Sequence, residues 1–118
     1  MSEVDIVLAF LGNLKEKGIS DIPFRDKDYF NGMRGINHYI RENNIKDFGT
    51  LFVNDGLYFS NICMNMMSLG YVSTDYERLY LNISEEMLKH ISKRNKVNEF
   101  ILNQIVDVFL KEVGLSVY

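Results

Sequence analysis

Tryptophan is absent from this chain of 118 residues, and cysteine and proline each occur once. The single cysteine, Cys63, excludes a disulfide within the chain and favours a reducing compartment. No apolar run approaches the roughly 20 residues that span a bilayer. Acidic Glu3 and Asp5 stand where a secretion signal would have basic residues. We therefore expect a cytoplasmic protein without membrane contacts.

Positive charge is outnumbered by negative charge. Lysine and arginine together number 13, against 16 aspartates and glutamates, so the net charge is −3. From Asp47 to Glu77 there is no lysine or arginine, whereas this stretch contains four acidic residues. Proteins that bind nucleic acid derive much of their affinity from cationic contacts to phosphates. The balance makes nucleic acid the less favoured partner, and a protein with a basic surface the favoured one.

Helical spacing of apolar residues organises the first third of the chain. It predicts a helix over about residues 3–17 and a second helix after Asp26, its N-cap. Gly32 and Gly35 lie inside the second helix, where each costs ~1 kcal/mol relative to alanine. Either the helix breaks there, or a neighbouring backbone packs closely against the pair. Residues 18–25, which include the only proline, are expected to form a loop.

The stretch after residue 49 contains two competing signals. The dipeptide Asp55-Gly56 is typical of a hairpin turn. Later apolar residues instead recur at helical spacing, and Asp55 is a suitable N-cap for such a helix. Between these alternatives, we favour a strand at about 50–53 and a helix at about 56–69.

A β-hairpin with a polar tip is expected at about residues 71–82, where Leu79 and Leu81 alternate on one face. Ser84 can then cap a further helix. From there the pattern fits one long helix to about residue 112, or two helices with a joint near Asn95. The sequence therefore predicts an α-rich α+β fold, with four or five helices and one small antiparallel β-hairpin. No linker or repeat divides the chain, so we expect a single domain over residues 1–118.

The helix at 56–69, followed by Gly70 and the hairpin, resembles the second half of a winged-helix domain, in which a recognition helix leads into a wing. The resemblance implies a nucleic-acid-binding transcriptional regulator. Its phosphate contacts would come from two basic clusters: Arg34, His38, Arg41, Lys89, Lys93 and Arg94. However, the preceding helix ends roughly a dozen residues too early for the short turn of a helix-turn-helix. The expected recognition helix also lacks the arginine or lysine that reads guanine. We keep the winged-helix-like order and this function as an alternative.

Aromatic residues gather in the acidic segment, and tyrosine and methionine are enriched at protein interfaces. Our leading hypothesis is a non-catalytic protein-interaction domain, such as a small adaptor, an inhibitor or an immunity-type protein. Its expected partner-binding surface is acidic and aromatic: Asp55, Tyr58, Asp75, Tyr76 and Glu77. The apolar faces of the first and last helices are also compatible with a homodimer.

Catalytic residues are harder to find. A nucleophile needs a base within hydrogen-bond reach, and the only combination is Cys63 with His38 or His90. Cys63 lies on the apolar stripe of its helix, so we expect a core cysteine. A small-ligand-binding domain with a pocket near Cys63 and His38 remains a third hypothesis. Two histidines and one cysteine leave zinc without a four-ligand set, and we expect no catalytic residue, metal or cofactor.

Overall fold

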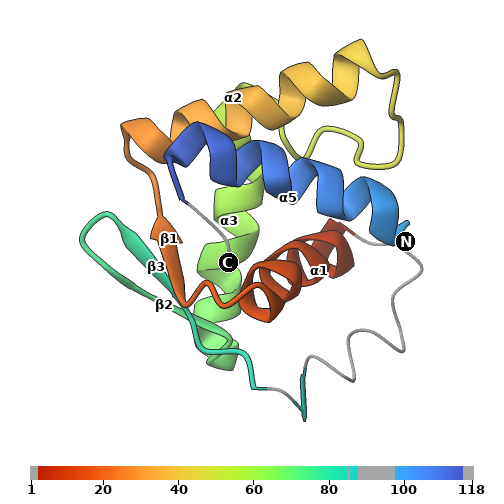
Figure 1. Ribbon diagram of the computed structural model, residues 1–118. Coiled ribbons are helices and arrows are strands. Elements are labelled where there is room, and N and C mark those ends of the chain that lie inside the picture. The colour runs from red at the N-terminus through yellow and green to blue at the C-terminus, as the bar shows by residue number, and fades with distance from the viewer. Residues whose placement is uncertain (1–2, 85, 88–97, 116–118) are drawn as a thin grey trace.

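The computed structural model describes residues 3–84, 86–87 and 98–115. Within these ranges the chain forms helices and a three-stranded antiparallel sheet (Figure 1). The helices are α1 (Glu3–Glu16), α2 (Lys27–Glu42), α3 (Leu57–Met66) and α5 (Glu99–Val113), with short 3-10 turns η1 (Asn54–Gly56) and η2 (Met67–Leu69) on either side of α3. The strands are β1 (Asp21–Pro23), β2 (Val72–Asp75) and β3 (Arg78–Leu81). The predicted α-rich α+β fold is confirmed.

The helices form one packed group, with the sheet at its side. α2 and α5 lie side by side, α1 packs against α5, and α3 runs from α2 towards the start of β2 (Figure 1). Phe10 of α1 is at the centre, because its ring lies 5.2 Å from Phe59 of α3 and 5.7 Å from Phe109 of α5, centroid to centroid. All three rings are fully buried, so the core joins α1, α3 and α5 directly.

Helix α2 begins where the sequence predicts, since the Asp26 carboxylate accepts a hydrogen bond from the Tyr29 N–H at 2.8 Å. The helix is unbroken at Gly32 and Gly35. A Cβ at residue 32 would lie only 2.6 Å from the Phe109 ring, so the missing side chain lets α5 approach. The predicted break is therefore wrong, and the predicted close packing involves side chains of α5 rather than a neighbouring backbone.

The loop predicted over residues 18–25 is wrong, because this segment contains β1. β1 is an edge strand that pairs with β3, in the strand order β1-β3-β2. Ile22 is fully buried, and Asp21 accepts a 2.6 Å ion-pair contact from Arg78 on β3. A strand of three residues that ends in Pro23 is permitted at an edge, where proline loses no ladder hydrogen bond on its outer side.

The strand predicted at 50–53 is also wrong. Leu51 and Phe52 are both buried, whereas a strand would direct them to opposite faces, and the segment turns instead. The helix predicted at 56–69 is present as α3 followed by η2. Its N-cap is Gly56 without a side-chain cap, so the predicted capping role of Asp55 is wrong.

The hairpin is confirmed in β2 and β3, with Val72 opposite Leu81 and Asp75 opposite Arg78. The sheet has a third strand, β1, that the sequence analysis missed. The order of α1, β1, α2, α3, β2 and β3 is compatible with a winged-helix-like arrangement, which stays a prediction. Residues 43–56 separate α2 from α3, a far longer connection than the turn of three or four residues in a helix-turn-helix.

The region after the hairpin favours two helices with a joint over one long helix. The Ser84 hydroxyl accepts a hydrogen bond from the Met87 N–H at 3.2 Å, as expected of a cap. α5 has its own N-cap, Asn98, whose extended backbone and side-chain hydrogen bonds to Phe100 and Ile101 begin a new helix. One continuous helix to residue 112 is therefore wrong. Asn95, the predicted joint, lies outside the described residues.

The apolar faces of α1 and α5 are used inside the molecule. Ile6, Leu11 and Leu14 of α1 are buried together with Ile105 and Leu110 of α5. These faces therefore give no support to the homodimer for which we considered them. None of the helices in the described ranges is long and apolar enough to cross a membrane.

The packing at Gly32 predicts opposite outcomes for two glycine substitutions in α2. Gly32→Ala should lower the free energy of unfolding by about 1–3 kcal/mol, because the new methyl group meets the buried Phe109 ring. Gly35→Ala is the matched control, because its neighbour is the exposed Glu112 side chain, which can rotate away. It should be neutral or stabilising by up to ~1 kcal/mol. Chemical denaturation measures both, and equal effects would contradict this packing.

Candidate functional site

The exposed side of α3 is the most distinctive surface of the described residues. The helix contains no charged residue at all. Leu57, Tyr58 and Met64 are 57%, 46% and 36% exposed, which is unusual for large apolar side chains. With two exposed asparagines they form what we call the α3 face: Leu57, Tyr58, Asn61, Met64 and Asn65. The opposite side of the helix is buried in the core.

The second exposed cluster is the hairpin tip, which consists of Asp75, Tyr76 and Glu77. Tyr76 is 98% exposed and has a left-handed backbone, with φ of 54°. The backbone carbonyl of Glu77 accepts a hydrogen bond from the Phe24 N–H at 2.8 Å, which ties the tip to the end of β1. The tip is thus a supported projection with an aromatic ring at its end.

The five residues predicted to bind a partner are all at the surface, but they lie in two places. Asp55 and Tyr58 are at the start of α3, whereas the hairpin tip projects away from that end of the helix (Figure 1). Leu57 and Met64, which are also exposed here, were not predicted from the sequence. Helical spacing could have indicated the exposure of Met64, because it places Met64 outside the apolar face that contains the buried Cys63 and Met66.

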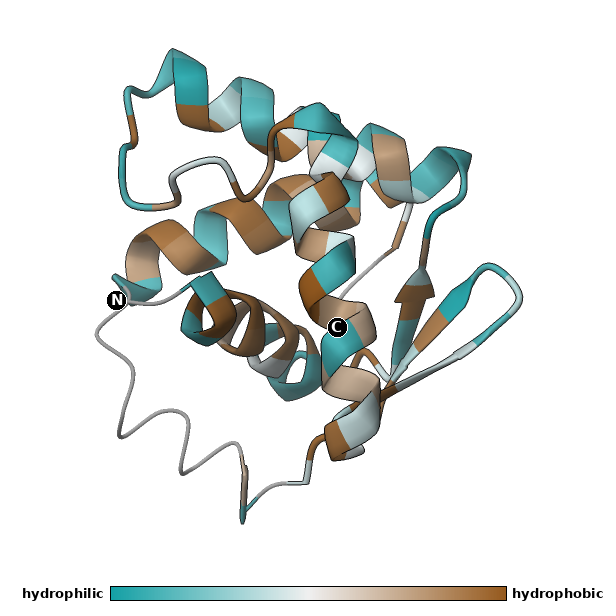
Figure 2. Ribbon diagram, turned by 180° about the vertical axis from the view of Figure 1, so that it is seen from behind, coloured by the Kyte–Doolittle hydropathy of each residue, from teal (hydrophilic) through white to brown (hydrophobic). Residues whose placement is uncertain are grey.

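The basic residues predicted on α2 do share one face. Figure 2 shows hydrophilic residues along much of this helix. Arg34, His38 and Arg41 line an open groove of about 750 Å³, which we call the α2 groove. Its other side is formed by Phe52, Asn54 and Asp55. His38 lies 3.0 Å from Glu42, and both side chains are exposed. Lys89, Lys93 and Arg94, the other predicted phosphate contacts, lie outside the described residues.

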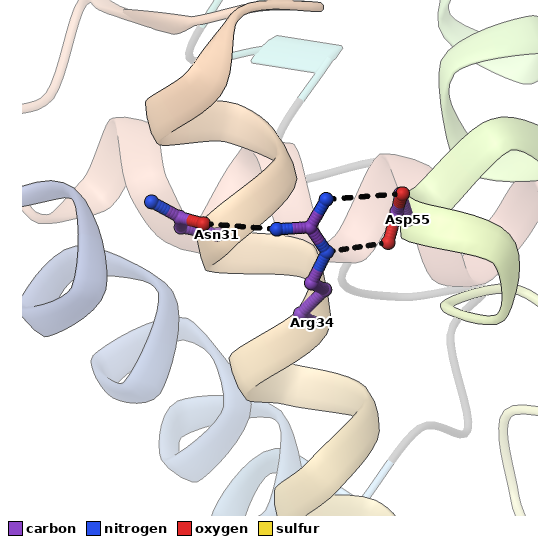
Figure 3. Close-up of polar contacts among 3 residues, drawn as sticks. All are labelled: Asn31, Arg34 and Asp55. Atoms are coloured by element: carbon purple, nitrogen blue, oxygen red, sulfur yellow. Dashed lines mark hydrogen bonds and ion pairs between the residues drawn. The ribbon is translucent and has the colours of Figure 1, made fainter.

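Arg34 and Asp55, which the sequence analysis assigned to two rival surfaces, form one ion pair (Figure 3). Arg34 Nε donates to Asp55 Oδ1 at 2.7 Å, and Nη2 donates to Oδ2 at 3.3 Å. Nη1 donates to Asn31 Oδ1 at 3.1 Å. The hydrogen bond from Arg34 lowers the pKa of Asp55, and the same contact raises the pKa of Arg34. The negative charge of Asp55 is therefore balanced by Arg34, and the guanidinium of Arg34 is engaged in this ion pair.

Cys63 is a core residue, as predicted. It is fully buried, and burial raises the pKa of its thiol to about 12. The side chain of His38 is 74% exposed and lines the α2 groove, which does not include Cys63. This groove therefore gives no support to the predicted pocket near both residues. Across residues 3–84, 86–87 and 98–115, no three His, Cys, Asp or Glu side chains gather as a metal site would require.

Comparison of the chain with protein-family models, with curated proteins and with solved structures finds no match. The surfaces described above are therefore the basis for any function of this chain.

Burial of Cys63 predicts an unreactive thiol. At pH 8 the thiol stays protonated, because its pKa is raised to about 12, and the surrounding core blocks reagents. A thiol-reactive dye should label the protein only after unfolding in denaturant. Labelling of the native protein at the rate of an exposed cysteine would contradict this placement.

The same shift predicts a loss of stability at high pH. In the unfolded chain the Cys63 thiol ionises near its ordinary pKa of 9.0, whereas the folded protein retains the proton until about pH 12. The free energy of unfolding should therefore decrease as the pH rises above 9. Cys63→Ala should make this decrease shallower, and Tyr29, whose pKa burial also raises, should account for part of the remainder. Parallel pH profiles for the two proteins would contradict the assignment.

Proposed function

We propose that this chain is a non-catalytic protein-interaction domain, such as a small adaptor, an inhibitor or an immunity-type protein. The observation that supports this function is the α3 face, an uncharged helix surface that exposes Leu57, Tyr58 and Met64. The centres of protein interfaces are depleted of charge and enriched in aromatic residues and methionine. The closed core around Cys63 is in keeping with a role that needs no nucleophile, and with a reducing, cytoplasmic location.

The partner we propose has a basic surface beside an apolar centre. At the hairpin tip, Asp75 and Glu77 are exposed, and neither has an ion pair within the part of the chain that the structure describes. Arg78, which lies opposite Asp75 in the hairpin, contacts Asp21 on the neighbouring strand instead. The tip therefore keeps its negative charge. Asp55 adds less than the sequence suggests, because Arg34 neutralises it.

A winged-helix-like regulator is the second candidate. The element order and the strand order β1-β3-β2 favour it, and Arg34 and Arg41 would supply contacts to phosphates. In such a protein α3 would enter the major groove, yet α3 has no cationic side chain. This candidate predicts binding that weakens steeply with added salt.

The interaction function predicts that partner capture depends on the α3 face. The tagged protein is used to capture proteins from the lysate of its source, with and without nuclease treatment. Leu57→Ala and Tyr58→Ala should each weaken binding of the recovered partner about fivefold or more, as interface hot spots do. Phe100→Ala is the matched control, since it removes an exposed ring, 71% accessible, from α5. It should leave binding unchanged.

Charge at the hairpin tip should act differently. Replacing Asp75 and Glu77 with Asn and Gln should slow association and reduce its salt dependence, as removal of rim charges does.

Equal losses for Tyr58→Ala and Phe100→Ala would contradict the proposal. Recovery that nuclease abolishes would favour the winged-helix-like candidate instead, and capture of this chain alone would indicate self-association.

A further inference from the structure

The turn that leads into α3 has an unusual backbone. Asn54, Asp55 and Gly56 have φ values of 54°, 58° and 74°, so three consecutive residues are left-handed. Residues other than glycine adopt this conformation as isolated exceptions, with asparagine and aspartate the best tolerated. Such a backbone persists only where the surrounding structure holds it in place, and it is frequent at functional sites.

Helix α2 holds the inner side of this turn. The buried Tyr29 hydroxyl donates a hydrogen bond to the Gly56 carbonyl oxygen at 3.0 Å. The side chain of Met33 occupies the space that a Cβ on Gly56 would need. Tyr29 and Met33 are one turn apart on α2, so they contact Gly56 from the same face of the helix. Glycine at residue 56 is favoured for two reasons: its backbone is left-handed, and the Met33 side chain leaves no room for a Cβ.

The outer side of the turn is held by Arg34, the residue after Met33. The guanidinium binds both carboxylate oxygens of Asp55, and its remaining nitrogen donates to Asn31 (Figure 3). Asn31 lies on α2 as well, so it keeps the guanidinium oriented towards Asp55. Each of the three guanidinium nitrogens thus donates to a group of the protein itself, which argues for a role within the protein.

The first turn of α3 depends on this arrangement. No side chain caps the helix, and the Leu57 N–H instead donates to the backbone carbonyl oxygen of Asn54 in the turn. The next residues after the turn are Leu57 and Tyr58, the most exposed apolar members of the α3 face. The conformation of the turn therefore sets the direction in which both side chains leave the surface.

We propose that Arg34 is a positioning residue for partner binding, which acts through Asp55 to hold the left-handed turn and thereby orient Leu57 and Tyr58. This inference rests on the proposed interaction function of the α3 face. Arg34 itself needs no contact with the partner. An exposed ion pair contributes little to global stability, so its removal should leave the fold intact.

The experiment is a double-mutant cycle with Arg34→Gln, Asp55→Asn and the combined variant. Asparagine at 55 retains the preference for a left-handed backbone, so the substitution removes the charge and keeps the turn residue type. Arg41→Gln is the matched control: it removes an arginine from the same face of α2 that has no ion pair within the described residues. Hydrogen exchange and partner affinity are measured for all four variants.

In the free protein, exchange of the Leu57, Tyr58 and Phe59 amides should be about two- to fivefold faster in each single variant, the range expected for an exposed ion pair. The double variant should be no faster than the single ones, because both residues act through one contact. Partner affinity should fall in parallel in these three variants. Exchange of the α5 amides should remain unchanged in all variants. The Arg41→Gln variant should match the unmodified protein in both exchange and partner affinity.

Unchanged exchange at residues 57–59 would overturn the inference, whatever the partner results show. Faster exchange with unchanged affinity would also overturn it, since the pair would then be structural only. Faster exchange in a protein whose binding is insensitive to Tyr58→Ala would instead show that the proposed function has failed while the ion pair still holds the turn. Additive effects in the double variant would show that Arg34 acts without Asp55.

Discussion

The close approach of α5 to α2 at Gly32 is the constraint on which the rest of the arrangement depends. It brings the Phe109 ring against α2, and that ring also packs against Phe10 of α1. With α2 seated against the core in this way, its buried Tyr29 and its exposed Arg34 hold the turn before α3 from the inner and the outer side. α2 thus connects the packed interior to the surface that we propose binds a partner.

Local patterns in the sequence predicted most of the helices and the hairpin, because each depends on neighbours a few residues apart. The Asp26 cap and the alternation of Leu79 and Leu81 are examples. β1 escaped prediction because a three-residue strand ending in Pro23 has no local pattern, and its partner β3 is distant in the sequence. The turn at 50–53 escaped because Leu51 and Phe52 are buried by tertiary contacts.

In the candidate site too, local sequence indicated some features, whereas others depend on tertiary contacts. Composition pointed to the segment that contains Tyr58 and Tyr76, and both are exposed. It could not show that they belong to two clusters, since that depends on how the hairpin leaves α3. Nor could it show that Arg34 and Asp55, 21 residues apart, cancel each other's charge. Charges counted along a chain describe a surface only after their ion pairs are known.

The left-handed turn at residues 54–56 also restricts how this sequence can diverge. Gly56 can change only if Met33 becomes smaller and the backbone relaxes at the same time, so the two positions should vary together. Arg34 and Asp55 form a second linked pair. The combination of Tyr29, Met33 and Arg34 with Asn54, Asp55 and Gly56 is therefore a signature by which distant relatives could be identified when overall identity is too low to align them.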